Sequence, residues 1–293
     1  MAIGLVCLCS CATPPEPEAT ATADLPAEVA MNKLSSFAPR LMVTLHLENG
    51  AEFKCCLDTG SPGTILPKAA EPQLGKRIGR GRIRTADGDI EKENLYAAPR
   101  IYLGDTQLIT EDRIATWTNA EGILGMDCLR HYCLQLDFQT MKIRFLQSSG
   151  IDAAGLGRAI PLTSLRYAYI RQDGFFERNN SPLLVDTGDP WDGMMNSRLV
   201  KQALQEQKAR PVPLRGFGDY KRKAPELVSF PTCVWNGETY TNLIVEAGRP
   251  DMIGLRFLAR HLVTFDFPKK VMYLKYTDAK SDQVKASPWS DHF

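Results

Sequence analysis

The 293-residue chain has no marked excess of charge of either sign and few residues that could form a metal site. Its 35 lysines and arginines are balanced by 34 aspartates and glutamates, so the formal net charge of +1 provides no basic field for a phosphate backbone. The four histidines are scattered along the chain, and no two cysteines stand in a Cys-x-x-Cys pair. We therefore expect no nucleic-acid partner, no metal and no cofactor.

The chain also lacks the cysteine pattern of a disulfide-stabilised domain. Of its eight cysteines, three lie in the first eleven residues and the other five are Cys55, Cys56, Cys128, Cys133 and Cys233. An odd number of cysteines in apolar surroundings is typical of buried thiols that pack as small hydrophobic residues. We expect these five to be unreactive.

Long hydrophobic runs are scarce, and the longest one opens the chain as AIGLVCLCSCA. It is too short for a membrane-spanning helix but fits the apolar part of an export signal. Its end resembles a bacterial lipoprotein signal, which implies lipidation of Cys11 and a position on the periplasmic side of the cell envelope. The first basic residue is only Lys33, so an upstream start, an ordinary cleaved signal and a plain apolar N-terminus remain alternatives. The following TPPEPEATATADLPAE reads as a linker, and residues 1–34 are assigned to signal and linker.

Two short motifs occur twice in the same order. CCLDTGS (55–61) is matched by LLVDTGD (183–189), where Asp186 lies 128 residues after Asp58. GILGMDCLRHYCLQLDF (122–138) is matched by DMIGLRFLARHLVTFDF (251–267) at a spacing of 129. Two ordered landmarks at nearly one spacing indicate an internal duplication, with halves at 35–150 and 151–293.

Local patterns predict a mainly β protein with two similar lobes. Apolar-rich runs flank turn signals at Asn49-Gly50, Asp173-Gly174 and Asn236-Gly237, which favours hairpins, and each DTG motif should follow a strand. Helical segments are few, with the best candidates at 128–132, 197–206 and 257–261. Asp137 and Asp266 recur at strand ends, where hydrogen-bonded turns are expected.

The repeated DTG at 58–60 and 186–188, with Ile123-Leu124-Gly125 and Met252-Ile253-Gly254, resembles the retropepsin and pepsin-like aspartic proteases over most of residues 40–276. The resemblance implies two β-barrel-like lobes in a pepsin-like architecture, with one catalytic aspartate from each lobe. Because both copies lie on one chain, it also implies an active monomer whose substrate is a peptide or unfolded protein in extended conformation.

Asp58 and Asp186 are the candidate catalytic pair. Two carboxyl groups within hydrogen-bonding reach do not both ionise readily, so the pair keeps one proton. One group then acts as base on a water and the other as acid toward the peptide carbonyl oxygen, without a covalent intermediate.

Around these aspartates the resemblance implies supporting roles. Gly60 and Gly188 should permit the sharp backbone beside each acid, and the two threonines should hydrogen-bond across the lobe junction. The hydroxyl of the residue after the first DTG should support Asp58. In the second half an aspartate replaces this hydroxyl, which either adds a like charge beside Asp186 or points harmlessly to solvent. The supporting set is Thr59, Gly60, Ser61, Thr187, Gly188 and Asp189.

The stretch GRGRIRTADGDIEKENLYAAP predicts a hairpin that turns at Ala86, Asp87 and Gly88. By resemblance it is the flap that closes over the substrate.

The sequence thus predicts an exported aspartic endopeptidase that is a hydrolase held at the membrane by at most a lipid anchor. One alternative is a catalytically inactive protease-like module that binds peptides or proteins in the cell envelope, which the unusual Asp189 motivates. A further alternative is a binder of sugars or envelope polymers on the same scaffold.

Overall fold

The computed structural model describes residues 29–31, 40–84, 90–146, 148–164, 166–171, 182–213 and 226–277. Over these residues the protein is mainly β, as expected, with three sheets and three short α-helices. The strands pair in antiparallel or mixed order, and among the described residues they form open sheets and no closed barrel. The barrel-like form expected of the two lobes is therefore not found in the described ranges.

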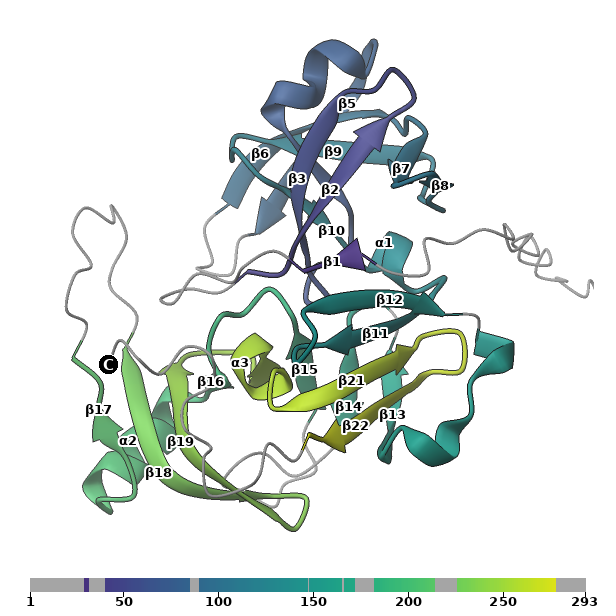
Figure 1. The fold of residues 1–293 in the computed structure, drawn as a ribbon. Coiled ribbons are helices and arrows are strands. Elements are labelled where there is room, and N and C mark those ends of the chain that lie inside the picture. The colour runs from purple at the N-terminus through teal and green to yellow at the C-terminus, as the bar shows by residue number, and fades with distance from the viewer. Residues whose placement is uncertain are drawn as a thin grey trace, which may run out of the picture.

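The first sheet belongs to the first half and forms the upper part of the molecule in Figure 1. Its nine strands are β2 (Met42–Leu47), β3 (Glu52–Leu57), β4 (Ile65–Pro67), β5 (Arg77–Arg84), β6 (Ile90–Ala97), β7 (Ile101–Leu103), β8 (Thr106–Gln107), β9 (Arg113–Trp117) and β10 (Gly122–Leu124).

The second sheet is antiparallel and takes strands from both halves, which run side by side below the first sheet in Figure 1. Its order is β1-β12-β11-β21-β22-β13, so the halves meet where β11 pairs with β21. Its strands are β1 (Val29–Ala30), β11 (Cys133–Asp137), β12 (Lys142–Leu146), β13 (Arg158–Ser164), β21 (His261–Asp266) and β22 (Val271–Tyr276).

The third sheet belongs to the second half and is joined to the second sheet through β13. Its other strands are β14 (Tyr169–Arg171), β15 (Pro182–Asp186), β16 (Gly193–Met195), β17 (Arg210–Pro211), β18 (Leu227–Trp235), β19 (Glu238–Ala247) and β20 (Met252–Gly254). The helices are α1 (Met126–Leu129), α2 (Ser197–Gln205) and α3 (Leu255–Leu258), with 3-10 turns at Lys68–Gln73, Ser148–Gly150 and Ala153–Gly155.

The first and third sheets repeat one topology. The series β3-β10-β4-β9-β6 has the same alternation of parallel and antiparallel pairs as β15-β20-β16-β19-β18. On the second sheet, Gln135 pairs with Thr264, which is its own counterpart 129 residues later, and the amide donates to the hydroxyl at 3.1 Å. The internal duplication inferred from the motifs therefore reappears as a pseudo-twofold arrangement about this pair.

The short turns follow the expected residue chemistry. Gly50 adopts a φ of +82° between β2 and β3, and Asn236 and Gly237 adopt +53° and +83° between β18 and β19. These left-handed angles favour Asn and Gly, which explains why the sequence identifies both hairpins. The turn expected at Asp173-Gly174 lies outside the described residues, although β14 and β15, which flank it, pair antiparallel.

The three helices overlap the predicted segments, and each is one residue shorter than predicted, with α1 and α3 also beginning two residues earlier. The helix α2 starts at an Asn196 side chain that accepts the N–H of Arg198 at 3.0 Å, and it buries Val200 and Ala203. The helices α1 and α3 are single turns that begin directly after the repeated glycines Gly125 and Gly254.

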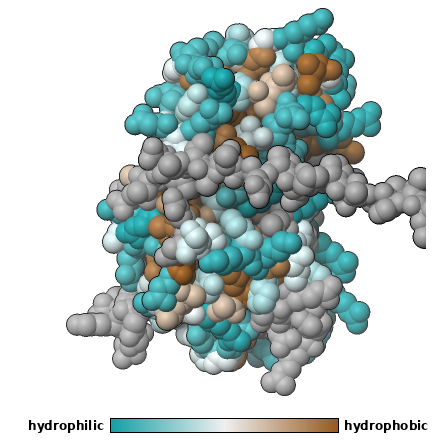
Figure 2. Space-filling model, turned by 90° about the vertical axis from the view of Figure 1, so that its right-hand side faces the viewer, coloured by the Kyte–Doolittle hydropathy of each residue, from teal (hydrophilic) through white to brown (hydrophobic). Residues whose placement is uncertain are grey.

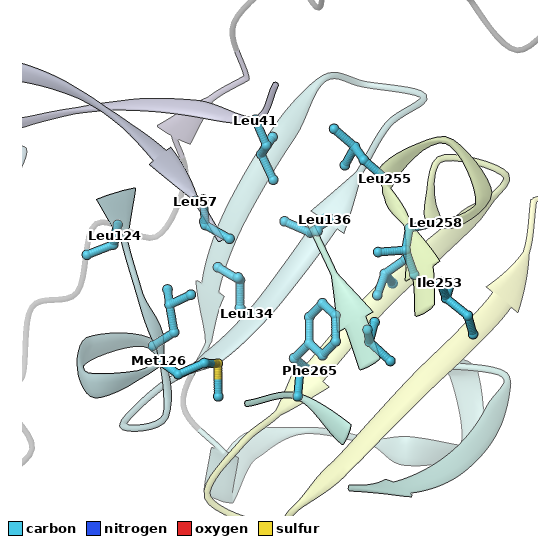
Figure 3. Packing of buried hydrophobic residues seen from close by; sticks show 14 of the residues in the cluster. Leu41, Leu57, Leu124, Met126, Leu134, Leu136, Ile253, Leu255, Leu258 and Phe265 are labelled. Atoms are coloured by element: carbon cyan, nitrogen blue, oxygen red, sulfur yellow. The ribbon is translucent and has the colours of Figure 1, made fainter. Parts of the chain in front are cut away.

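A continuous hydrophobic core joins the two halves. Figure 3 shows Leu57 and Leu134 of the first half next to Leu136, with Phe265 and Leu258 of the second half beyond them. All five are buried in one cluster, so the halves share a core instead of each having its own.

The surface is mostly hydrophilic on the face drawn in Figure 2, where brown hydrophobic groups are small and scattered among the coloured residues. No helix in the described part of the chain has the length and apolar character that crossing a bilayer requires.

The start of the folded part differs from the expected boundary. Val29 and Ala30 pair with β12, Met31 is buried, and its N–H donates to Met141 at 2.8 Å. The linker was expected to end at 34, but Val29 and Ala30 form a strand of the second sheet and Met31 is buried. A two-residue strand is too short to produce a period in the sequence, which is why it was missed.

Candidate active site

Each candidate aspartate lies at the end of a strand that runs parallel to an apolar-apolar-Gly strand. Asp58 follows β3, beside β10, and its N–H donates to Leu124 at 3.0 Å. Asp186 ends β15, beside β20, where it pairs with Gly254. A parallel neighbouring strand thus fixes the backbone at each aspartate.

The two threonines of the DTG motifs interlock across the junction. The N–H of Thr59 donates to Oγ1 of Thr187 at 3.0 Å, and the N–H of Thr187 donates to Oγ1 of Thr59 at 3.1 Å. Their hydroxyls donate to Val185 at 2.5 Å and to Leu57 at 2.7 Å. Both threonines are fully buried, and the expected hydrogen bonds between the halves are present.

The glycines of the motifs bring the two carboxyl groups together. The N–H of Gly60 donates to Asp58 and that of Gly188 to Asp186, each at 2.8 Å. A Cβ on Gly188 would stand 2.6 Å from Asp58 Oδ2, and one on Gly60 would collide with the Asp186 carboxyl group. Neither glycine has a left-handed φ. The need for glycine here was expected to come from the backbone angle. It comes instead from the opposite carboxyl group, which leaves no room for a Cβ.

The two carboxyl groups form one hydrogen-bonded pair. Burial raises the pKa of Asp58 well above its usual range, and the neighbouring Asp186 charge raises it further. Burial likewise raises the pKa of Asp186, while the amides of Gly188 and Gly60 and the hydrogen bond from Asp58 favour its ionised form. Both residues keep some exposed surface. The pair can therefore hold one proton and still meet a solvent molecule.

The residues that follow the two DTG motifs adopt the same backbone but differ in their side chains. The N–H groups of Ser61 and Asp189 donate to the carbonyls of Asp58 and Asp186, both at 3.3 Å. The Ser61 hydroxyl donates to Gly63 at 2.9 Å, so support of Asp58 comes from the Ser61 main chain and not from the expected hydroxyl. Asp189 points inward and is only 7% exposed, which excludes the harmless solvent-facing alternative.

An ion-pair cluster behind the second DTG motif was missed by the sequence analysis. Asp192 is fully buried, accepts the N–H of Ile244 at 2.7 Å, and lies 3.1 Å from Arg256 and 3.0 Å from Arg260. Its carbonyl accepts the N–H of Gly254 at 3.0 Å. This cluster fixes the strand that supports Asp186.

In the first half a hydrogen-bonded pair occupies the positions that match Asp192 and Arg256. Thr64 donates to Asp127 at 2.6 Å, and its hydroxyl accepts the N–H of Gly125 at 3.2 Å. An alignment of the two halves could have signalled both positions, because Thr64 and Asp127 stand opposite Asp192 and Arg256.

The candidate flap is described only in its two arms. Strands β5 and β6 pair antiparallel up to Arg84 and Ile90, which agrees with the predicted hairpin. The proposed tip at Ala86, Asp87 and Gly88 lies outside the described residues, and so does Cys11.

The cysteines and the possible metal ligands lie in the following surroundings. All five described cysteines are buried thiols, and burial raises the pKa of Cys55 to about 12, so its thiol stays protonated. In the described ranges no group of three or more His, Cys, Asp or Glu side chains could hold a metal ion.

No family model matches the chain, and no curated protein matches it in sequence.

Proposed function

We propose that the protein is an aspartic endopeptidase with a two-lobed, pepsin-like architecture that acts as a monomer. The observation that carries the proposal is the hydrogen-bonded pair of Asp58 and Asp186, brought together by reciprocal Thr59 and Thr187 bonds from two halves of one repeat. A pair of this kind has one base and one acid at the same point, which is what water attack on a peptide bond requires.

In the proposed reaction the ionised carboxylate takes a proton from a bound water, whose oxygen attacks the peptide carbonyl carbon. The protonated carboxyl group of the pair gives its proton to the carbonyl oxygen as the C=O bond becomes single. When this intermediate collapses, the C–N bond breaks and the leaving nitrogen takes the proton that the base had removed from the water. The other carboxylate, now ionised, takes a proton from a hydroxyl of the intermediate as the new C=O bond forms, so the pair again holds one proton. Either Asp58 or Asp186 can hold the shared proton at the start of the reaction, because the pair titrates as one unit.

The substrate is proposed to be an extended peptide or an unfolded protein. The first sheet ends in β5, whose outer edge has no partner strand within the described residues, and a peptide could pair with such an edge. The flap role of β5 and β6 belongs to the same proposal.

The test is cleavage of a denatured protein by the full chain between acidic and neutral pH. Asp58→Asn and Asp186→Asn should each reduce cleavage by at least about 10³-fold, because each removes one half of the acid–base pair. Asp105→Asn, in an exposed turn, is the matched control and should cleave normally. Cleavage that survives either dyad substitution would contradict the proposal.

A binding module without hydrolysis is the second candidate, favoured by the buried Asp189 beside Asp186. It predicts that the same peptides bind to the unsubstituted chain, uncut at any pH, with an affinity that survives both dyad substitutions.

We also propose that the protein is exported and lipid-anchored through Cys11 on the periplasmic side of the envelope. The sequence of residues 2–12 carries this proposal. Cys11→Ser should move the protein from the membrane fraction to the soluble fraction, and unchanged fractionation would count against a lipid anchor.

A further inference from the structure

Asp189 is a buried carboxyl group that the proposed reaction does not use. Its Oδ1 accepts the N–H of Trp191 at 3.2 Å, while its Oδ2 is buried and has no hydrogen-bond partner among the described residues. The Oδ2 atom packs against Gly254, where a Cβ would stand 2.5 Å away. The side chain is therefore wedged beneath the loop that bears Asp186, between it and the strand β20.

The first half shows what this position does without an acid. Ser61 and Asp189 accept equivalent bonds, from the N–H of Met126 at 2.9 Å and from that of Leu255 at 2.8 Å. With the backbone the same, the difference lies in the side chain, which is a neutral hydroxyl in one half and a titratable acid in the other. The second catalytic loop alone thus contains a third carboxyl group.

The charges around Asp189 oppose its ionisation. The acids that face it are Asp186 at the end of β15, Asp192 on its own loop and Glu246 on β19. The nearby cations, Arg256 and Arg260, are paired with Asp192. Burial first, and then the Asp186 charge, raises the pKa of Asp189 well above its usual range.

We propose that Asp189 is a positioning residue that holds the Asp186 loop in its active arrangement only while it is protonated, and so confines peptide hydrolysis to lower pH. This inference rests on the proposed function. The neutral acid fits the buried site. When its proton leaves to solvent, the carboxylate keeps one hydrogen-bond donor and pairs with no cation within the described part of the chain. It also places a negative charge beside Asp186, so the loop must shift.

The direction of the pH effect follows from the raised pKa. In the unfolded chain an aspartate titrates near about 4, whereas folded Asp189 keeps its proton to a higher pH. The folded state then binds more protons, so its stability is fully present below about pH 4 and is lost as the pH rises toward the folded pKa. Over that window the unfolding constant should increase by up to about tenfold per pH unit on account of Asp189.

The experiment compares the full chain with Asp189→Ser, which copies the first half, and with the nearly isosteric Asp189→Asn, which keeps an acceptor for Trp191. Asp105→Asn is the control acid. In both Asp189 variants the pH at which kcat/KM falls on the alkaline side of its profile, the alkaline limb, should be higher by about one pH unit or more. In the control this pH should equal that of the unsubstituted chain. Ser61→Asp, the mirror change, should move the limb down. A second measurement, urea unfolding from pH 4 to 8, should show a shallower loss of stability in the Asp189 variants.

The outcomes separate the two proposals. If the unsubstituted chain cleaves no peptide at any pH, the proposed function fails, and the role of Asp189 in catalysis fails with it. If the chain cleaves but the limb stays in place in both Asp189 variants, only the inference about Asp189 is overturned. Equal pH slopes of stability in the variants and the unsubstituted chain would overturn it as well.

Discussion

Two side chains, Thr59 and Thr187, link the two halves beside the candidate aspartates. Each hydroxyl accepts the N–H of the other threonine and donates to the main-chain carbonyl of the residue that precedes the opposite aspartate. Because all these groups are buried, water cannot replace a lost partner. Loss of either hydroxyl should therefore lower the stability of the folded chain even when the volume of the side chain is kept.

We expect Thr187→Val, which keeps the shape and removes the hydroxyl, to lower the free energy of unfolding by about 1–3 kcal/mol. The change leaves the N–H of Thr59 and the carbonyl of Leu57 without their partner. Thr187→Ser is the matched control, since it retains the oxygen. Urea unfolding at fixed pH measures the difference, and a valine variant as stable as the serine variant would show that the hydroxyl carries no stability.

At this scale the sequence identified the repeated motifs and the unusual Asp189, and it missed the buried pairs whose residue types differ between the halves. The DTG motifs recur, so Asp58 and Asp186 could be paired before any coordinates. In the second half the positions of Thr64 and Asp127 are occupied by Asp192 and an arginine. The residue types differ, so a comparison of repeated motifs did not detect this pair. The inward direction of the Asp189 side chain depends on packing against Gly254, which a linear pattern does not encode.

At the scale of elements, turn chemistry was the most reliable signal. Asn49-Gly50 and Asn236-Gly237 located two hairpins because left-handed angles select these residue types. Asp137 and Asp266 were correctly placed in hydrogen-bonded turns, as each accepts main-chain N–H groups two or three residues later. Strand β1 was missed, since its two residues owe their conformation to pairing with β12.

The position of β1 leads to a prediction about where the folded part begins. A chain that starts at residue 35 lacks β1 and the buried Met31, whereas one that starts at residue 23 keeps both. We expect the shorter chain to be less stable by about 2 kcal/mol or more, from the loss of Met31 burial and of the β1–β12 hydrogen bonds.

Thermal and urea unfolding of the two chains side by side measure this effect. Met31→Ala in the longer chain isolates the side-chain part, with an expected loss of about 2–5 kcal/mol if the site does not collapse. Identical unfolding midpoints for the two chains would show that β1 adds nothing to the fold.

At the scale of the whole molecule, the duplication was visible in the sequence but its consequence for the sheets was not. The repeated motifs implied two similar units. In the structure the units are fused, because β11 and β21 pair along five residues of each strand and one hydrophobic cluster spans both halves. This fusion depends on contacts between segments more than a hundred residues apart, which no local period reports.

The fusion predicts how the molecule unfolds. Two independent lobes would melt in two steps, as multidomain chains commonly do. Here separation of the halves would break the β11–β21 pairing, the threonine bonds and the shared core at once, so neither half keeps the second sheet intact alone. We therefore expect a single calorimetric transition, with a calorimetric enthalpy equal to the van't Hoff enthalpy, and coincident loss of far-UV and tryptophan signals. Two resolved transitions would show that the halves fold separately, and with that the rigid placement of Asp58 against Asp186 would lose its structural basis.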